Sequence, residues 1–255
     1  MPASWWRRFS AYLTPPPLAD APWQQALSDC VLARRLDAAR QDELRRLVAV
    51  FLARKRFHAL AGAELSEDMR VLIAMQACLP VLQQGPKALR GWRNILVYPG
   101  EFKVRRRHHD EPSGVVSESE EVLIGESWER GPLVLSLADV QLDLEQPWDG
   151  FNVVVHEIAH KLDMLDGPAD GVPPLPPPIP RRQWIVAFQR AFDYLSNEVA
   201  RGRDTLIDPY AAESADEFFA VVSELHWSQP GVLRRADAPV ADLLEAYYGP
   251  SPAPR

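Results

Sequence analysis

The sequence predicts an α+β fold that is mainly helical and has a small mixed or antiparallel sheet. Two observations lead to this prediction. Apolar residues recur at helical spacing through most of the chain, for example at Leu44, Leu47, Val48 and Phe51. Between residues 85 and 140, short apolar runs bounded by glycine and proline are instead typical of strands.

Six helical regions and three strands are expected. Ser66 has the side chain of a helix N-cap, and Pro80 lies where a helix beginning there would end. Residues 171–180 contain six prolines and are expected to form a stiff extended connector. Residues 103–111 are rich in charge and are expected to form a solvated loop or an edge hairpin. The predicted helices fall within residues 21–60 (two or three helices), 65–82, 151–165, 183–199, 211–227 and 239–248, and the predicted strands are residues 94–98, 121–124 and 132–137.

Length and composition limit the class of protein. The 255 residues suit one main domain, residues 65–255, with a helical N-terminal segment, residues 1–64, that packs on it or belongs to it. Hydrophobic residues make up 47% and charged residues 25%, as in soluble globular proteins. The net charge of -7 gives no support to nucleic-acid binding.

The sequence shows no secretory signal, and its longest apolar run, residues 71–82, is too short for the roughly 20 residues that span a bilayer. A cytoplasmic protein without a membrane span is expected. Cys30 and Cys78 lie in apolar helical contexts and are expected to be buried free thiols.

Residues 156–160 read His-Glu-Ile-Ala-His within a segment of helical character. Positions four apart lie one above the other on a helix, so His156 and His160 can present two imidazoles to one metal ion. Glu157 is placed to reach a water on that ion as a general base. This spacing is the signature of zinc peptidases.

A catalytic zinc site needs a third protein ligand, and the spacing leaves several candidates. Asp166 lies six residues after His160, but the position where related sites have a glycine is Asp163 here. A glutamate on a later helix is the alternative, and Glu217 is favoured because the apolar run after it draws its carboxylate inward. The other glutamates available on that helix are Glu213 and Glu224.

Asp163 lies on the same predicted helical face as His156 and His160. Two interpretations of this residue stay open. It orients a ligand imidazole from behind, or it is an exposed salt-bridge partner.

Taken together, these motifs resemble the MtfA (Mlc titration factor A) family of bacterial zinc peptidases. The resemblance covers most of the chain from about residue 65 onward, and the first sixty residues match only loosely. The matching segments are residues 156–167, 171–175, 208–211 and 217–221, with 125–128, 131–132 and 134–136 in the strand region.

The resemblance implies a zincin-like peptidase fold and one Zn2+ per chain, with Glu217 as the third ligand beside His156 and His160, the gluzincin-type arrangement. It implies that Tyr210 is an active-site tyrosine, at a Tyr-to-Glu spacing similar to that in the catalytic core of anthrax lethal factor. It also implies aminopeptidase-like activity on small peptides and binding of the glucose-responsive repressor Mlc. The alternative hypothesis is a binding protein that sequesters such a transcriptional regulator and holds zinc only as a structural ion.

Overall fold

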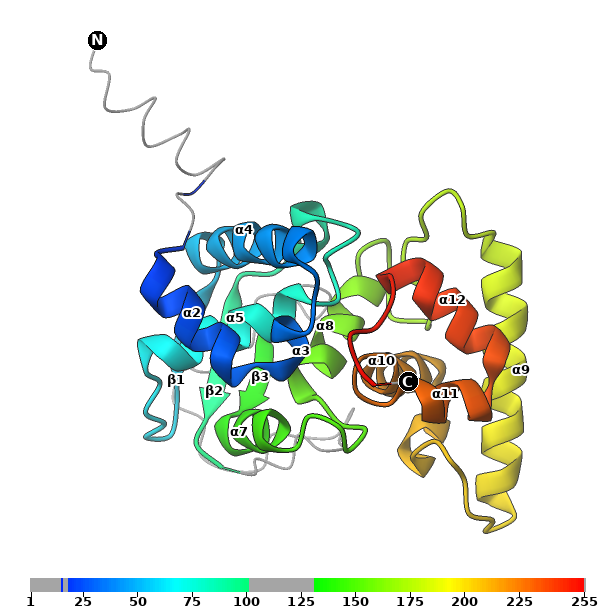
Figure 1. Ribbon diagram of the computed structural model, residues 1–255. Helices are drawn as coiled ribbons and strands as arrows, with labels where there is room; N and C mark the ends of the chain where they lie inside the picture. The colour runs from blue at the N-terminus through cyan, green and yellow to red at the C-terminus, as the bar shows by residue number, and fades with distance from the viewer. Residues whose placement is uncertain (1–14, 16–17, 101–130, 255) are drawn as a thin grey trace.

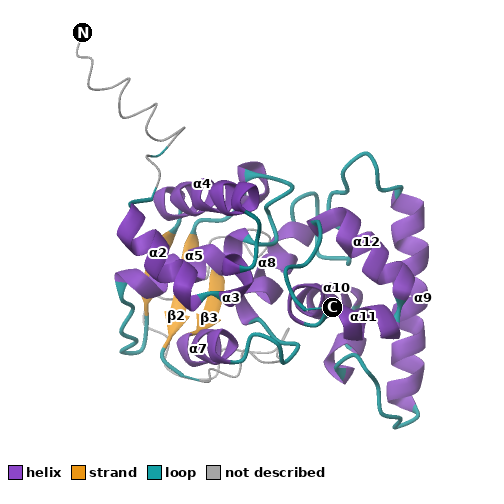
Figure 2. Cartoon of the chain, in the orientation of Figure 1, coloured by secondary structure: helices purple, strands orange, loops and turns teal. Residues whose placement is uncertain are grey.

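A computed structural model describes residues 15, 18–100 and 131–254 (Figure 1). Most of these residues are helical, and three short strands form one sheet (Figure 2). The prediction of a mainly helical fold with a small sheet is therefore confirmed. The elements are α2 (Asp20–Asp29), α3 (Val31–Arg34), α4 (Ala38–Arg54), β1 (Arg56–Ala59), α5 (Glu67–Cys78), η1 (Pro86–Leu89), β2 (Asn94–Tyr98), β3 (Leu133–Ser136), α7 (Leu137–Glu145), α8 (Val153–Asp163), α9 (Arg181–Ala200), η3 (Pro209–Ala212), α10 (Ala215–Ser228), α11 (Pro230–Ala236) and α12 (Ala238–Tyr248).

Three predicted segments lie outside the described residues: the strand at residues 121–124, the charged loop at residues 103–111 and the family-like motif at residues 125–128. Elsewhere the helices follow their expected positions. Ser66 caps α5 by accepting a hydrogen bond from the backbone N–H of Met69 at 3.1 Å. The short helices α7 and α11 were not predicted. Cys30 and Cys78 are buried and free, as expected.

The sheet is parallel among its described strands, so the prediction of a mixed or antiparallel sheet is wrong for them. The strand order is β1-β2-β3, with Phe57 opposite Ile95 and Ile95 opposite Leu133. Parallel neighbours need a long crossover connection, and α5 lies within the connection from β1 to β2. The strand patterns in the sequence do not determine strand direction, and residues 56–59 were included in a helical region.

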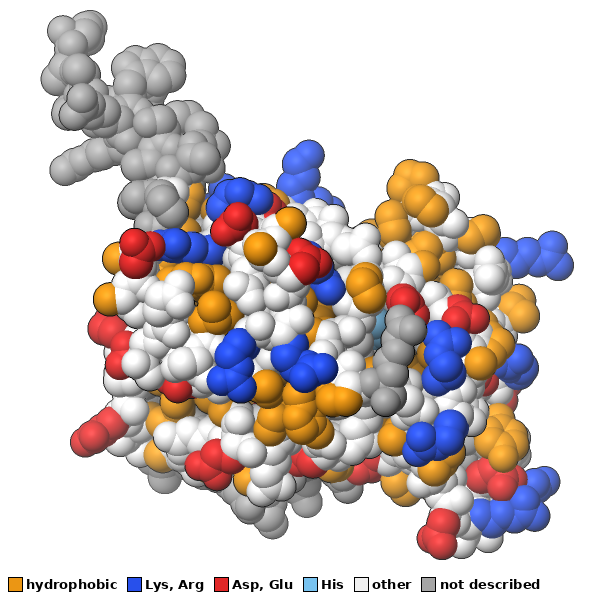
Figure 3. Space-filling view, in the orientation of Figure 1, with side chains coloured by type: hydrophobic (Ala, Val, Ile, Leu, Met, Phe, Trp, Pro, Cys, Tyr) orange, Lys and Arg blue, Asp and Glu red, His pale blue; other side chains and the backbone are white. Residues whose placement is uncertain are grey.

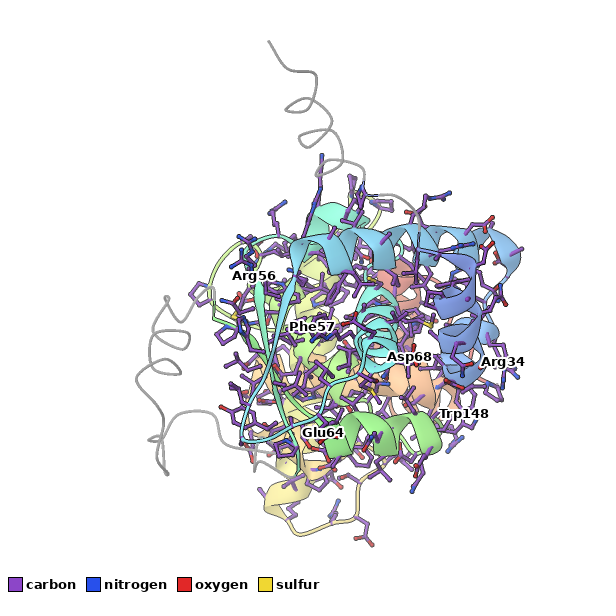
Figure 4. All side chains as sticks on the ribbon, turned by 90° about the vertical axis from the view of Figure 1, so that its left-hand side faces the viewer. Arg34, Arg56, Phe57, Glu64, Asp68 and Trp148 are labelled. Atoms are coloured by element: carbon purple, nitrogen blue, oxygen red, sulfur yellow. The ribbon has the colours of Figure 1, made fainter. Side chains whose placement is uncertain are left out.

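β1 is too short to be recognised from its own sequence. It follows α4 almost directly, and its backbone is held by pairing with β2. Phe57, labelled in Figure 4, packs its ring 6.3 Å from that of Phe51 on α4. Residues before position 64 therefore contribute a strand to the sheet as well as helices.

The buried side chains form one core whose composition changes across the molecule, and α8 lies near its middle (Figure 1). On one side, the sheet and α2, α4 and α5 bury mainly aliphatic side chains such as Leu44, Leu47 and Ile73. On the other side, α9, α10 and α12 bury an aromatic cluster, in which Trp184 stacks on Phe188 with ring centroids 4.2 Å apart. α8 packs against both α5 and α10, so it is held from both sides.

None of the described helices has the length and apolar character needed to cross a membrane. On the face drawn in Figure 3, acidic and basic side chains are interspersed and do not gather into a patch of one sign.

Candidate metal centre

α8 carries the His-Glu-x-x-His motif, and two side chains fix the start of this helix. Asn152 caps it by accepting a hydrogen bond from the backbone N–H of Val155 at 2.9 Å. The backbone N–H of Val153 donates to the buried carboxylate of Asp143, on α7, at 2.7 Å. Because the apolar residues of α8 pack into the core, its imidazoles are left on the side that faces α10. The buried apolar residues are Val154, Val155, Ile158, Ala159 and Leu162.

α10 brings two buried carboxylates to α8. It begins after Ser214, whose hydroxyl accepts a hydrogen bond from the backbone N–H of Glu217 at 3.4 Å, and this cap separates α10 from η3 in the region predicted as one helix. Glu217 and Glu224 are seven residues apart, so they share one face of the helix. Both are buried, at 2% and 5% exposure, which a carboxylate tolerates only with partners.

The structure brings the three predicted ligands together. His156 Nε2 lies 3.2 Å from Glu217 Oε2, and His160 Nε2 lies 3.6 Å from the same oxygen. The two Nε2 atoms are 3.1 Å apart. Among the described residues, this is the only group of three or more histidine, cysteine, aspartate or glutamate side chains that could hold a metal ion.

These distances fit a zinc ion. Ligands at ordinary zinc–nitrogen and zinc–oxygen distances, placed on the corners of a tetrahedron, are about 3.3 Å apart. The three observed separations lie on either side of that value. Two imidazoles and one carboxylate are also a ligand set of catalytic zinc sites, which leave the fourth position open.

The electrostatics of His156 and Glu217 also favour a cation beside them. Burial acts to lower the pKa of His156, but the charges and hydrogen bonds of Glu224 and Glu217 raise that pKa well above its usual range. Burial acts to raise the pKa of Glu217, but hydrogen bonds from His156 and His160 hold that pKa well below its usual range. Both shifts arise because negative carboxylates lie against the imidazoles, and the same negative charge would favour a metal cation at this point.

Tyr210, in η3, lies beside the three ligands. Its ring centroid is 6.3 Å from that of His156, with the ring planes tilted by 31°. Burial, and then the charge of Glu217 and a hydrogen bond to it, raise the pKa of Tyr210, and Glu157 adds to the effect. The phenol therefore keeps its proton at neutral pH and can act as a hydrogen-bond donor.

The other candidates from the sequence lie elsewhere. Asp166 and Glu213 are exposed, and neither belongs to the metal-binding group. Asp163 is 1% exposed, so its interpretation as an exposed salt-bridge partner is wrong. Its Oδ2 accepts a hydrogen bond from the backbone N–H of Gly171 at 2.7 Å, so the carboxylate ties the end of α8 to the proline-rich connector.

The carboxylate that contacts a ligand imidazole from behind is Glu224. Its Oε1 is 2.7 Å from His156 Nδ1. From the sequence, Glu224 was suggested only as an alternative third ligand, and Asn152 and Gln76, which support it, were not singled out. Two signals were present: the spacing of two helical turns from Glu217, and an asparagine directly before an apolar helical run.

Comparison with known proteins agrees with the site. The profile of a family described as glucose-regulated metallo-peptidase M90 matches residues 3–249. Mlc titration factor A of Klebsiella pneumoniae is 40% identical over 218 residues, which are 83% of this chain and 79% of that protein. The protein of the same name from Pectobacterium atrosepticum is 37% identical over 239 residues, which are 91% of this chain and 87% of that protein. The predicted resemblance is confirmed, and the chain belongs to the family of glucose-regulated metallo-peptidases M90.

Proposed function

We propose that the protein is a zinc-dependent peptidase with aminopeptidase-like activity on short peptides in the cytoplasm. One observation carries the proposal: His156, His160 and Glu217 converge on one point at the ligand spacing of a zinc ion. The family of metallopeptidases to which the chain belongs supports the reaction class.

His156 and His160 would hold the ion through Nε2, and Glu217 through its carboxylate. Bound zinc supplies a Lewis acid for the scissile carbonyl and lowers the pKa of a water toward about 7. Glu157, the residue after His156 on α8, would act as the general base, and its carboxylate would accept a proton and later give it to the leaving amine.

Tyr210 donates a hydrogen bond to the carbonyl oxygen as negative charge develops on it. The substrate aligns as an extended chain along β3, the last strand in the described order of the sheet and a neighbour of α8.

The test combines metal analysis with hydrolysis of aminoacyl chromogenic substrates and a peptide library. We expect about one zinc per chain, and hydrolysis that a chelator abolishes and added zinc restores. In Glu157→Gln, zinc content is retained while hydrolysis falls by roughly 10²–10⁴-fold, because the general base is lost.

Glu64→Gln is the matched control. Glu64 is exposed in the loop before α5, on the face shown in Figure 4, and its substitution removes the same charge. We expect it to leave hydrolysis unchanged. Unaltered turnover in Glu157→Gln would refute the mechanism, and a zinc-free active protein would refute the metal site.

A second candidate function comes from the relatives, which carry the name Mlc titration factor A. The name supports binding of a glucose-responsive repressor of the Mlc type. A repressor that is co-purified equally by wild type and Glu157→Gln would show binding independent of catalysis. Failure of both proteins to bind a repressor from the same organism would refute this function.

A further inference from the structure

A buried carboxylate lies behind His156, on the side of the imidazole away from the metal position. Glu224 Oε1 is 2.7 Å from His156 Nδ1. The other oxygen, Oε2, accepts a hydrogen bond from the backbone N–H of Asn152 at 2.6 Å. One carboxylate therefore holds both the ligand imidazole and the residue that begins α8.

Asn152 and Gln76 support this carboxylate in turn. The side chain of Asn152 accepts a hydrogen bond from Val155 N and donates one to Gln76 Oε1 at 2.7 Å. Gln76 lies in the last turn of α5, is 1% exposed and is surrounded by buried apolar neighbours. A continuous hydrogen-bonded path thus runs from the core helix α5 through Asn152 and Glu224 to His156.

The path determines which nitrogen of His156 carries hydrogen. An ionised carboxylate only accepts hydrogen bonds, so its contact at Nδ1 requires a hydrogen on that atom. In the neutral imidazole, the lone pair is then on Nε2, which faces Glu217 Oε2 and His160 Nε2.

The two histidines differ in the length of the ion pair at Nδ1. His160 Nδ1 forms an ion pair with Asp216, whose Oδ2 is 3.9 Å away. The corresponding separation at His156 is 2.7 Å. Of these two ion pairs, the one between His156 and Glu224 is the shorter and is within hydrogen-bond distance.

We propose that Glu224 is a positioning residue that fixes the tautomer and ring orientation of His156 for metal binding, and that Asn152 and Gln76 hold Glu224 in place. This inference rests on the proposed zinc site. Carboxylates behind ligand histidines raise metal affinity by orienting the ring and increasing the basicity of the ligand nitrogen.

Glu224→Gln tests the proposal with little change in size. Both partners of the carboxylate are donors, the backbone N–H of Asn152 and Nδ1–H of His156. An amide can accept from only one of them, and its NH2 group then faces the other donor. We expect a zinc affinity about 10–100-fold weaker than in wild type, measured by competition with a chromogenic chelator.

The control Glu64→Gln should keep the wild-type zinc affinity, since Glu64 is exposed and lies before α5. Equal affinities in wild type, Glu64→Gln and Glu224→Gln would overturn the proposal while leaving the zinc site intact. Absence of zinc binding in wild type would instead refute the proposed function on which the inference rests.

If the Glu224→Gln variant does not fold, a second measurement on the wild-type protein still tests the proposal. Long-range 1H–15N spectra of zinc-loaded wild type should show His156 protonated at Nδ1 and coordinated through Nε2. Coordination through Nδ1 would overturn the proposal. Thermal unfolding of the metal-free proteins distinguishes a positioning role of Glu224 from a structural one. Loss of a merely structural glutamate would lower Tm without changing the zinc affinity of the folded protein.

Discussion

α8 and α10 contribute to the candidate site in different ways. α8 carries two imidazoles and the proposed general base within five consecutive residues, so its pattern is set by helical geometry alone. α10 carries Glu217 in front of the imidazoles and Glu224 behind one of them, more than fifty residues later in the chain. The chemistry of α8 is local, whereas that of α10 depends on how the two helices pack. Substitutions on the two helices should therefore have different effects on zinc content and on peptide hydrolysis.

The largest effect is expected for Glu217→Ala. This substitution removes the only carboxylate in the metal-binding group of the described residues and leaves two imidazoles. Zinc content should fall sharply and peptide hydrolysis should be lost, in contrast to Glu157→Gln on α8, which keeps its zinc. Full zinc occupancy in Glu217→Ala would move the ligand role to another residue of the chain.

Tyr210→Phe should slow hydrolysis by about 10²–10³-fold, as expected for the loss of one oxyanion donor. The ring stays beside His156, so its packing is preserved. Because the phenol acts in the transition state, kcat should fall while KM and zinc content change little. A change confined to KM would indicate that Tyr210 binds substrate and does not stabilise the oxyanion.

Asp163, the last residue of α8, should make the free energy of unfolding depend on pH. Burial raises the pKa of Asp163 from 3.8 to about 6, although the hydrogen bond from Gly171 opposes this. Between these values the folded chain binds more protons than the unfolded chain, so the free energy of unfolding falls as pH rises from about 4 to 6 and is then level. The loss amounts to about 2–3 kcal/mol.

Asp163→Asn should remove this dependence. Chemical denaturation of the metal-free proteins at several pH values checks it. The difference in the free energy of unfolding between wild type and Asp163→Asn should change from about pH 4 to 6 and be constant above about pH 7. Parallel profiles across the range would show that Asp163 titrates normally.

The smallest effects are expected at the two helix caps. Asn152→Ala should lower the free energy of unfolding by about 2 kcal/mol, because it removes the cap of α8 and leaves Gln76 Oε1 buried without its donor. Ser214→Ala should cost only about 0.5–1 kcal/mol, since its hydrogen bond to Glu217 N is long, at 3.4 Å. Equal losses in urea titrations would show that the path through Gln76 adds nothing to the cap.

Prediction from sequence succeeded where the pattern was local. The helices around Leu47 and His156 have several turns of apolar periodicity, and β2 is a run of five residues bounded by turns. It failed at β1, whose four residues are a strand because β2 lies alongside. The sequence also suggested two possible roles for Asp163, and the hydrogen bond that Asp163 accepts from Gly171 belongs to neither of them.

The sequence by itself determined that His156 and His160 share one helical face and that Glu157 follows the first of them, because 3.6 residues per turn fixes positions four apart. It also determined the family, through motifs spread along the chain. Spacing favoured Glu217 over Glu213 and Glu224 and the family resemblance implied it, but only the tertiary structure shows where each carboxylate lies. Spacing along α10 says that two of these carboxylates share a face, but the distance to an imidazole depends on the packing of α8 against α10. That packing puts Glu217 3.2 Å from His156 Nε2 and Glu224 2.7 Å from His156 Nδ1.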